Sequence, residues 1–165
     1  MFSFLKKGDK VEESNELRLK AFVSGRVIPI TEVPDKMFSS KCLGDGLAII
    51  PTDQVLRAPE SGQVLIVNEG TFHACGMKLR NGMEILLHIG LDTVSMNGDG
   101  FTSHVKEGDR VKAGDPLITF DLNKIRAAGF STETIMVITD AGKATDIKMH
   151  TGILAIAGET VVMDF

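Results

Sequence analysis

The 165-residue sequence lacks tryptophan and tyrosine, and its only cysteines are Cys42 and Cys75. Any stacking on bases or sugars would therefore have to use phenylalanine. No Cys-x-x-Cys pair and no signal peptide are present, so we expect two reduced thiols in a cytoplasmic protein. No apolar run approaches the roughly 18–20 residues needed to span a bilayer.

The chain also lacks an excess of basic residues. Its 18 Lys and Arg against 22 Asp and Glu give a formal net charge of −4, which argues against nucleic-acid binding. There is no Gly-x-x-x-x-Gly-Lys-Ser/Thr loop for a nucleotide and no Gly-x-Ser-x-Gly nucleophile elbow. No group of Cys and His has the spacing of a structural zinc site. We expect no cofactor and no resident metal.

Short apolar runs separated by Gly, Pro, Asp and Asn make up most of the chain, which contains 17 glycines. This pattern predicts a mostly β fold, an antiparallel β-sandwich or barrel-sandwich hybrid with one or two short helical turns. One helix is expected at Leu122–Ala128, because Asp121 is a good N-cap and Gly129 suits the C′ position. The expected strands are Leu19–Val23, Arg26–Ile30, Leu47–Ile50, Val55–Ala58, Gln63–Val67, Thr71–Leu79, Met83–Ile89, Arg110–Val111, Leu117–Asp121, Thr134–Ile138, Thr145–Met149, Ile153–Ala155 and Thr160–Met163.

The beginning of the chain differs in composition from the rest. Residues 1–17 are predicted to be a flexible tail, and residues 18–165 to be one folded domain. Within the tail, residues 1–7 are apolar and then basic. They could also form a short amphipathic segment that contacts a membrane surface weakly and reversibly.

The most informative stretch is 71–94, which holds two of the four histidines, His73 and His88. Between them, Asn81-Gly82 is the strongest hairpin signal in the sequence. We expect it to form a two-residue type I′ loop. A loop longer by one residue would flip one strand and separate the histidines, so their pairing depends on the length of the turn.

The two-residue loop would pair Arg80 with Met83 and place Cys75 opposite His88. Because side chains alternate between the faces of a strand, His73, Cys75 and His88 would then share one face. His73 and His88 would be diagonal cross-strand neighbours about 7–8 Å apart. For Cys75 the favoured interpretation is still a small buried hydrophobic residue.

Two imidazoles on one face allow three kinds of chemistry: metal binding, acid–base catalysis, or nucleophilic catalysis in which the second ring steadies charge. The third suits phosphoryl transfer, and it needs no metal. Asp92 follows His88 by four residues, and Thr71 could hydrogen-bond the ring of His73 and fix its tautomer. The residues alone leave all three open, beside the plainer interpretation of two partly buried polar side chains.

The segment Leu87–Val94 resembles the active-site signature of the glucose-family enzyme IIA domain. That domain is the phosphocarrier of the bacterial phosphoenolpyruvate-dependent sugar phosphotransferase system. The resemblance runs from about residue 20 to 165. It is supported by further blocks at Val33–Phe38, Gly44–Ile49, Ala58–Gly62, Thr71–Ala74, Gly98–Phe101 and Glu107–Val111.

The resemblance implies a phosphotransferase component with a compact antiparallel β-sandwich fold. It implies that His88 accepts a phosphoryl group from a phosphohistidine on HPr. His88 would then pass the group to a cysteine of a sugar-specific enzyme IIB domain. The resemblance further implies that His73 supports the phosphoryl group and that Thr71 orients His73.

The resemblance also implies a partner-binding rim around the histidines. An apolar ring would exclude water from a labile phosphohistidine, and flanking carboxylates would attract the basic surroundings of the histidine in HPr. Glycine would let the backbone approach the phosphate. The implied rim residues are Asp35, Met37, Phe38, Gly90, Asp92 and Val94.

Two rival interpretations remain. His88-x-x-x-Asp92 matches a zinc-ligand pair of LytM-type hydrolases, although the chain has no His-x-His motif that those enzymes also need. A non-catalytic regulatory binding module would use the same apolar face. Two imidazoles are good ligands in isolation, so zinc could bind between His73 and His88. Such a metal would be adventitious or regulatory.

Overall fold

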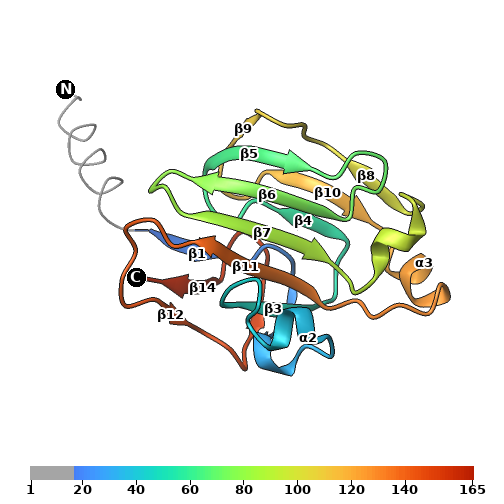
Figure 1. The fold of residues 1–165 in the computed structure, drawn as a ribbon, viewed down its shortest axis with the longest axis horizontal. Coiled ribbons are helices and arrows are strands. Elements are labelled where there is room, and N and C mark those ends of the chain that lie inside the picture. Colours follow the sequence, from blue (N-terminus) through green and yellow to red (C-terminus); the bar gives the residue numbers. More distant parts are fainter. Residues whose placement is uncertain (1–16) are drawn as a thin grey trace.

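The computed structural model describes residues 17–165 (Figure 1). The predicted tail and its membrane contact lie outside the described residues, except for Leu17. The side chain of Leu17 is buried in the core. Within residues 17–165, no helix has the length and apolar character required to cross a membrane.

The described chain forms three antiparallel sheets. The largest has eight strands in the order β13-β2-β3-β11-β7-β6-β5-β9, and two three-stranded sheets have the orders β1-β14-β12 and β4-β10-β8. The strands are β1 (Arg18–Lys20), β2 (Gly25–Pro29), β3 (Gly46–Pro51), β4 (Val55–Arg57), β5 (Gly62–Val67), β6 (Ala74–Leu79), β7 (Glu84–Ile89), β8 (Phe101–Ser103), β9 (Arg110–Val111), β10 (Pro116–Phe120), β11 (Thr134–Asp140), β12 (Lys148–Met149), β13 (Leu154–Ala155) and β14 (Val161–Asp164).

The predicted mostly β sandwich is confirmed, and each expected strand has a counterpart within a few residues. The unpredicted strand is β8, which has one apolar residue, Phe101. The expected helix is present as α3 (Leu122–Ala127). The Asp121 carboxylate accepts the Lys124 N–H at 3.1 Å, and Gly129 follows with φ 87°. The shorter elements η1 (Ile30–Glu32), α2 (Lys36–Ser39) and η2 (Thr93–Met96) were not expected.

Two apolar clusters lie on opposite faces of the large sheet. The main core draws on all three sheets, and a smaller cluster lies beneath α2. Strand β11 is buried on both faces, since Met136 packs in the main core and Ile135 in the smaller cluster. This explains why β11 reads as a continuous apolar run and not as an alternating one.

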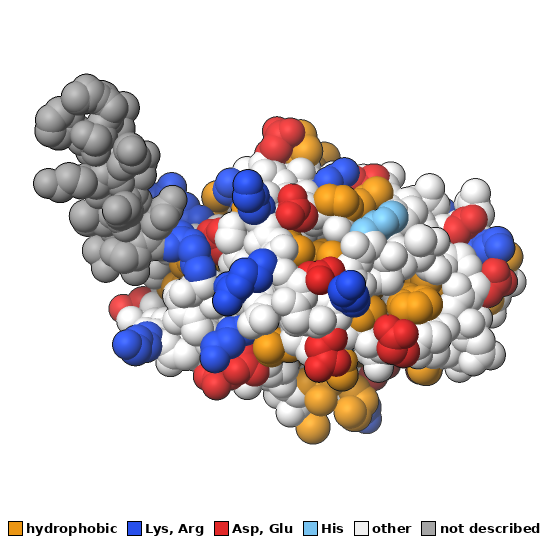
Figure 2. All heavy atoms as spheres, turned by 90° about the horizontal axis from the view of Figure 1, so that it is seen from above, with side chains coloured by type: hydrophobic (Ala, Val, Ile, Leu, Met, Phe, Trp, Pro, Cys, Tyr) orange, Lys and Arg blue, Asp and Glu red, His pale blue; other side chains and the backbone are white. Residues whose placement is uncertain are grey.

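Charged side chains of both signs are mixed on the surface. On the face shown in Figure 2, Lys and Arg side chains lie among Asp and Glu, and neither sign forms an unbroken layer. This agrees with the small formal net charge of −4. Hydrophobic side chains reach the surface in separate groups between them.

Candidate functional site

The ring of His73 meets the ring of His88 edge to face, with centroids 5.0 Å apart and an interplanar angle of 86°. His88 lies on β7 and His73 immediately before β6. In the sheet, Ala74 pairs with His88, and His88 pairs with Ile135 on β11. His88 therefore faces away from the main core, on the side of the sheet that carries the cluster beneath α2.

The hairpin turn differs from the prediction. The loop is 80–82, one residue longer than expected: the N–H of Leu79 donates to the carbonyl of Met83 at 2.7 Å, and the N–H of Gly82 donates to the carbonyl of Leu79 at 2.9 Å. Gly82 has φ 92°, whereas Asn81 is not among the residues with positive φ. A type I′ loop needs positive φ at both central residues, so the predicted turn and the pairing of Arg80 with Met83 are wrong.

The longer loop shifts the register by one residue. Cys75 pairs with Leu87 and not with His88, and its side chain is fully buried in the main core. Burial raises the pKa of the Cys75 thiol to about 12. The predicted shared face of Cys75 and His88 is therefore wrong, and the interpretation of Cys75 as a small buried hydrophobic residue is confirmed.

The two histidines meet despite the changed register. His73 precedes the first residue of β6, and Phe72 before it has a left-handed backbone with φ 50°. The carbonyl of His73 still accepts the N–H of Ile89 at 2.8 Å. The strict alternation of faces does not hold at this irregular end of the strand, so the ring of His73 can reach that of His88.

Each imidazole has one nitrogen held by a neighbour. Nδ1 of His88 lies 2.8 Å from the carbonyl oxygen of Gly90, and Nδ1 of His73 lies 2.9 Å from Oγ1 of Thr71. A carbonyl can only accept, so Nδ1 of His88 carries the hydrogen. In the neutral ring of His88, the lone pair is then on Nε2.

Glycine is required at position 90. Its φ is 70°, a left-handed conformation that side chains disfavour. A Cβ there would lie 2.6 Å from Cγ2 of Thr93 and 2.9 Å from the carbonyl oxygen of Ser131. The Thr93 hydroxyl is buried and donates to the carbonyl of Ile89, and the N–H of Leu91 donates to the carbonyl of Ser131. These contacts fix the peptide whose carbonyl holds His88.

Burial keeps both histidines neutral near pH 7. Burial, and then the nearby His88, lower the pKa of His73 from 6.5 to about 4. Burial also lowers the pKa of His88, while the bond to Gly90 and the charges of Asp35 and Asp92 oppose that shift. A neutral imidazole has a free lone pair, which is what a nucleophile needs.

The remaining predicted rim residues come from α2 and η2. The ring of Phe38 is nearly buried, with its centroid 5.1 Å from that of His88. Met37 is 54% exposed and Val94 50% exposed. The Asp35 carboxylate accepts the N–H of Met37 at 2.9 Å and so caps α2. Asp92 is at the start of η2 with φ 61°.

Two residues that shape the site were not predicted: Thr93 and Ser131. Thr93 is fully buried, and a threonine directly after a strand in an apolar segment was the available signal. Ser131 is far from Gly90 in the sequence and acts through its backbone carbonyl, so its residue type gave no signal. In the described part of the chain, no group of three or more His, Cys, Asp or Glu side chains is arranged to hold a metal.

Comparison with known proteins agrees with this geometry. The family model described as phosphoenolpyruvate-dependent sugar phosphotransferase system, EIIA 1, matches residues 17–144. Proteins named PTS system glucose-specific EIIA component from Bacillus cereus and Bacillus anthracis are each 47% identical over 151 residues, covering 92% of this chain and 91% of theirs. The solved structure of glucose permease IIA from Mycoplasma capricolum matches with a TM-score of 0.82 and 38% identity, covering 90% of this chain and 96% of that one.

An antiparallel β-sandwich with two contacting imidazoles is thus the scaffold of a phosphoryl carrier. The chain belongs to the EIIA 1 family of the phosphoenolpyruvate-dependent sugar phosphotransferase system. It is a phosphotransferase component that carries phosphoryl groups for sugar transport, and an EIIA component interacts with HPr and with an EIIB domain. The resemblance seen in the sequence is confirmed.

Proposed function

We propose that Nε2 of His88 is the atom that carries the phosphoryl group. The observation that supports this assignment is the hydrogen bond from Nδ1 of His88 to the carbonyl of Gly90, at 2.8 Å. That bond keeps the proton on Nδ1, so Nε2 is the ring nitrogen left to attack phosphorus. Nδ1 of His73 is held only by the hydroxyl of Thr71, which can donate or accept, and this leaves the tautomer of His73 adjustable.

Transfer takes two steps with the same chemistry. In the first, the lone pair on Nε2 of His88 attacks the phosphorus of a phosphohistidine on HPr, a new P–N bond forms, and the P–N bond to HPr breaks. In the second, a cysteine thiolate of the EIIB domain attacks the same phosphorus and the bond to Nε2 breaks. Throughout, Nδ1–H of His88 stays bonded to Gly90, where the carbonyl dipole stabilises the positive charge of the phosphorylated ring.

His73 supports the phosphoryl group in this proposal. Nδ1 of His73 lies 2.9 Å from Oγ1 of Thr71, whereas that hydroxyl lies at a longer 3.5 Å from the carbonyl of Asn68. When the hydroxyl of Thr71 donates to Nδ1, the ring hydrogen of His73 is on Nε2, and this is the tautomer that we assign to the phosphorylated state. Nε2–H then donates to a phosphoryl oxygen on His88, and the added negative charge raises the pKa of His73.

The rim serves docking in the same proposal. Met37 and Val94 offer exposed apolar surface on α2 and η2, and the Phe38 ring shields one side of His88. Together they exclude water from the phosphohistidine when a partner is bound. Asp35 and Asp92 add negative charge near His88, which speeds encounter with a basic partner surface.

The sugar and the compartment complete the proposal. The Bacillus relatives are named glucose-specific, so we propose glucose as the sugar whose EIIB domain receives the phosphoryl group. We also propose a cytoplasmic location, where an exposed free thiol such as Cys42 stays reduced.

The test is phosphoryl transfer from labelled phosphoenolpyruvate through enzyme I and HPr to this protein. We expect an acid-labile, base-stable label on the wild type and on His104→Gln, a matched control because His104 is exposed and bonds Thr119. We expect none on His88→Gln. Label that persists in His88→Gln would contradict the assignment of His88 as the carrier. Transfer to a non-glucose EIIB domain in preference to a glucose-specific one would contradict the assignment of glucose as the sugar.

A further inference from the structure

A hollow with basic and apolar residues in its lining lies at the other end of the β6–β7 hairpin from the histidines. It encloses about 490 Å³, within the usual range of small-ligand pockets. It is formed by β6, β5 and β9, of which β9 is the edge strand of the large sheet. Its lining is Ser61, Gly62, Gln63, Lys78, Leu79, Arg80, Gly82, Arg110 and Val111.

The strand register places cations on both sides of this hollow. Gln63 pairs with Lys78 on one side and with Arg110 on the other, so these three side chains form one cross-strand row. Two strand spacings separate Lys78 from Arg110, about 9–10 Å. Arg80, in the loop after β6, also lines the hollow. Three cations thus surround a neutral amide in a chain with a formal net charge of −4.

Within residues 17–165, Lys78 and Arg110 form no ion pair. Glu84 pairs with Lys78 in the β6–β7 ladder but does not line the hollow. The Asp109 carboxylate accepts the backbone N–H of Lys106 in the preceding turn. An anion placed between Lys78 and Arg110 would be attracted by both side chains and so would be stabilised.

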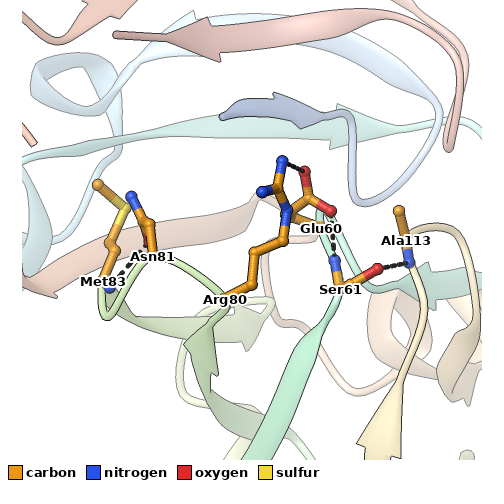
Figure 3. A network of polar contacts seen from close by, with 6 residues as sticks. All are labelled: Glu60, Ser61, Arg80, Asn81, Met83 and Ala113. Carbon is orange, nitrogen blue, oxygen red and sulfur yellow. Dashed lines mark hydrogen bonds and ion pairs between the residues drawn. The ribbon is translucent and has the colours of Figure 1, made fainter. Parts of the chain in front are cut away.

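Arg80 is positioned at one wall of the hollow. Figure 3 shows its side chain extending toward Glu60, with Ser61 alongside. Nη2 of Arg80 lies 3.6 Å from Oε2 of Glu60, and Oε1 of Glu60 accepts the N–H of Ser61 at 2.6 Å. The Ser61 hydroxyl accepts the N–H of Ala113 at 3.1 Å and keeps its own hydrogen to donate. The wall therefore holds a guanidinium that is paired with Glu60 and a hydroxyl that can donate, in a fixed arrangement.

We infer that this hollow binds a small phosphorylated polyhydroxy molecule, with the phosphate between Lys78 and Arg110 and the hydroxyl groups toward Gln63 and Ser61. Lysine and arginine are the usual phosphate ligands. The Gln63 Nε2 donates to the carbonyl of Gly108 at 3.3 Å, which leaves its carbonyl oxygen to accept from a ligand hydroxyl. Gly82 leaves the end of the hollow open, since no heavy atom lies within 4 Å of where its Cβ would be.

The test is a titration of the full-length protein, followed by amide NMR shifts, with glucose 6-phosphate, glucose and inorganic phosphate as probes. We expect saturable shifts at Gln63, Lys78 and Arg110 with glucose 6-phosphate, at least tenfold weaker binding of inorganic phosphate, and no binding of glucose. Shifts confined to His73 and His88 would overturn the inference. Equal affinity for the two phosphates would overturn the polyhydroxy assignment.

Paired variants separate the site from simple net charge. The double variant Lys78→Gln/Arg110→Gln should weaken glucose 6-phosphate binding at least tenfold, and Arg26→Gln/Lys148→Gln, with the same change of charge on distant exposed residues, should not. Equal weakening in both would overturn the inference. HPr-dependent labelling of His88 serves as an independent readout, and it should be unchanged in the first variant.

Discussion

The rings of His73 and His88 meet edge to face with centroids 5.0 Å apart, yet their hydrogen-bond partners differ. A carbonyl, which can only accept, holds Nδ1 of His88, and a hydroxyl, which can do both, holds Nδ1 of His73. This difference supports separate roles for two histidines that look alike in the sequence: one attacks, and the other adapts its hydrogen to the group that arrives.

The first prediction concerns His73→Gln. The nucleophile and its bond to Gly90 remain, so phosphoryl acceptance from HPr should stay within about threefold of the wild type. Transfer to EIIB should fall about 100-fold, because a transition-state donor to the phosphoryl oxygens is lost. Rapid-quench measurements of the two steps check this. A loss confined to the acceptance step would show that the roles of the two histidines are reversed.

The second prediction concerns Thr71→Val, which removes the hydroxyl but keeps a similar shape. Loss of one hydrogen bond of about 1 kcal/mol should slow transfer to EIIB about fivefold by freeing the ring of His73. The variant Thr71→Ser retains the hydroxyl and should transfer at close to the wild-type rate. If valine and serine behave alike in the same assay, Thr71 does not orient His73.

The third prediction concerns Gly90→Ala. The new Cβ would meet Thr93 and Ser131 at 2.6 and 2.9 Å in a backbone with φ 70°. Left-handed strain and overpacking together should cost about 2–4 kcal/mol of unfolding free energy. Urea denaturation measures this cost.

Gly129→Ala is the matched control for that substitution. Its φ is 87°, but no heavy atom lies within 4 Å of the added Cβ. Only the cost of the left-handed backbone, about 1–2 kcal/mol of unfolding free energy, should remain. Equal destabilisation by the two substitutions would show that Thr93 and Ser131 do not press on position 90.

The fourth prediction concerns pH. The pKa of His73 is about 4 in the folded protein, against an ordinary value of 6.5. Between these values the unfolded chain binds a proton that the folded chain does not, so the free energy of unfolding falls as the pH is lowered from 6.5 to 4. The loss attributable to His73 is about 3 kcal/mol and is complete below pH 4, where both states are protonated.

The measurement for the fourth prediction is urea denaturation at several pH values. His73→Gln should have a shallower dependence between pH 4 and 6.5 than the wild type. His88 has a pKa lowered in the same direction, so part of the slope should persist. Identical slopes in the two proteins would contradict the low pKa of His73.

The sequence predicted the positions of the strands well. It predicted the wrong register for β6 and β7, because it gave the loop between them one residue too few. Asn81-Gly82 signals a turn, and Gly82 does take positive φ. However, the side chain of Asn81 accepts the N–H of Met83 at 3.0 Å and the loop gains a residue. Both loop lengths place glycine in a left-handed conformation, so local preference could not choose between them.

The meeting of His73 and His88 was predicted from the wrong register. It depends on the left-handed backbone of Phe72, with φ 50°, a conformation that is rare outside glycine and cannot be read from residue type. Likewise, Ser131 restricts Gly90 through a backbone carbonyl, which no side-chain pattern reveals. The family resemblance supplied the roles of the histidines, and the structure adds the hydrogen bonds that make those roles chemically reasonable.

Strand β7 is an interior strand of the large sheet, hydrogen-bonded to β6 on one side and β11 on the other. We propose His88, on this strand, as the nucleophile. A strand paired on both sides is held in place, so donor and acceptor use one rigid surface in turn. In the proposed relay, HPr and EIIB therefore compete for the same face. The kinetics should be ping-pong, and a large excess of unphosphorylated HPr should inhibit delivery to EIIB.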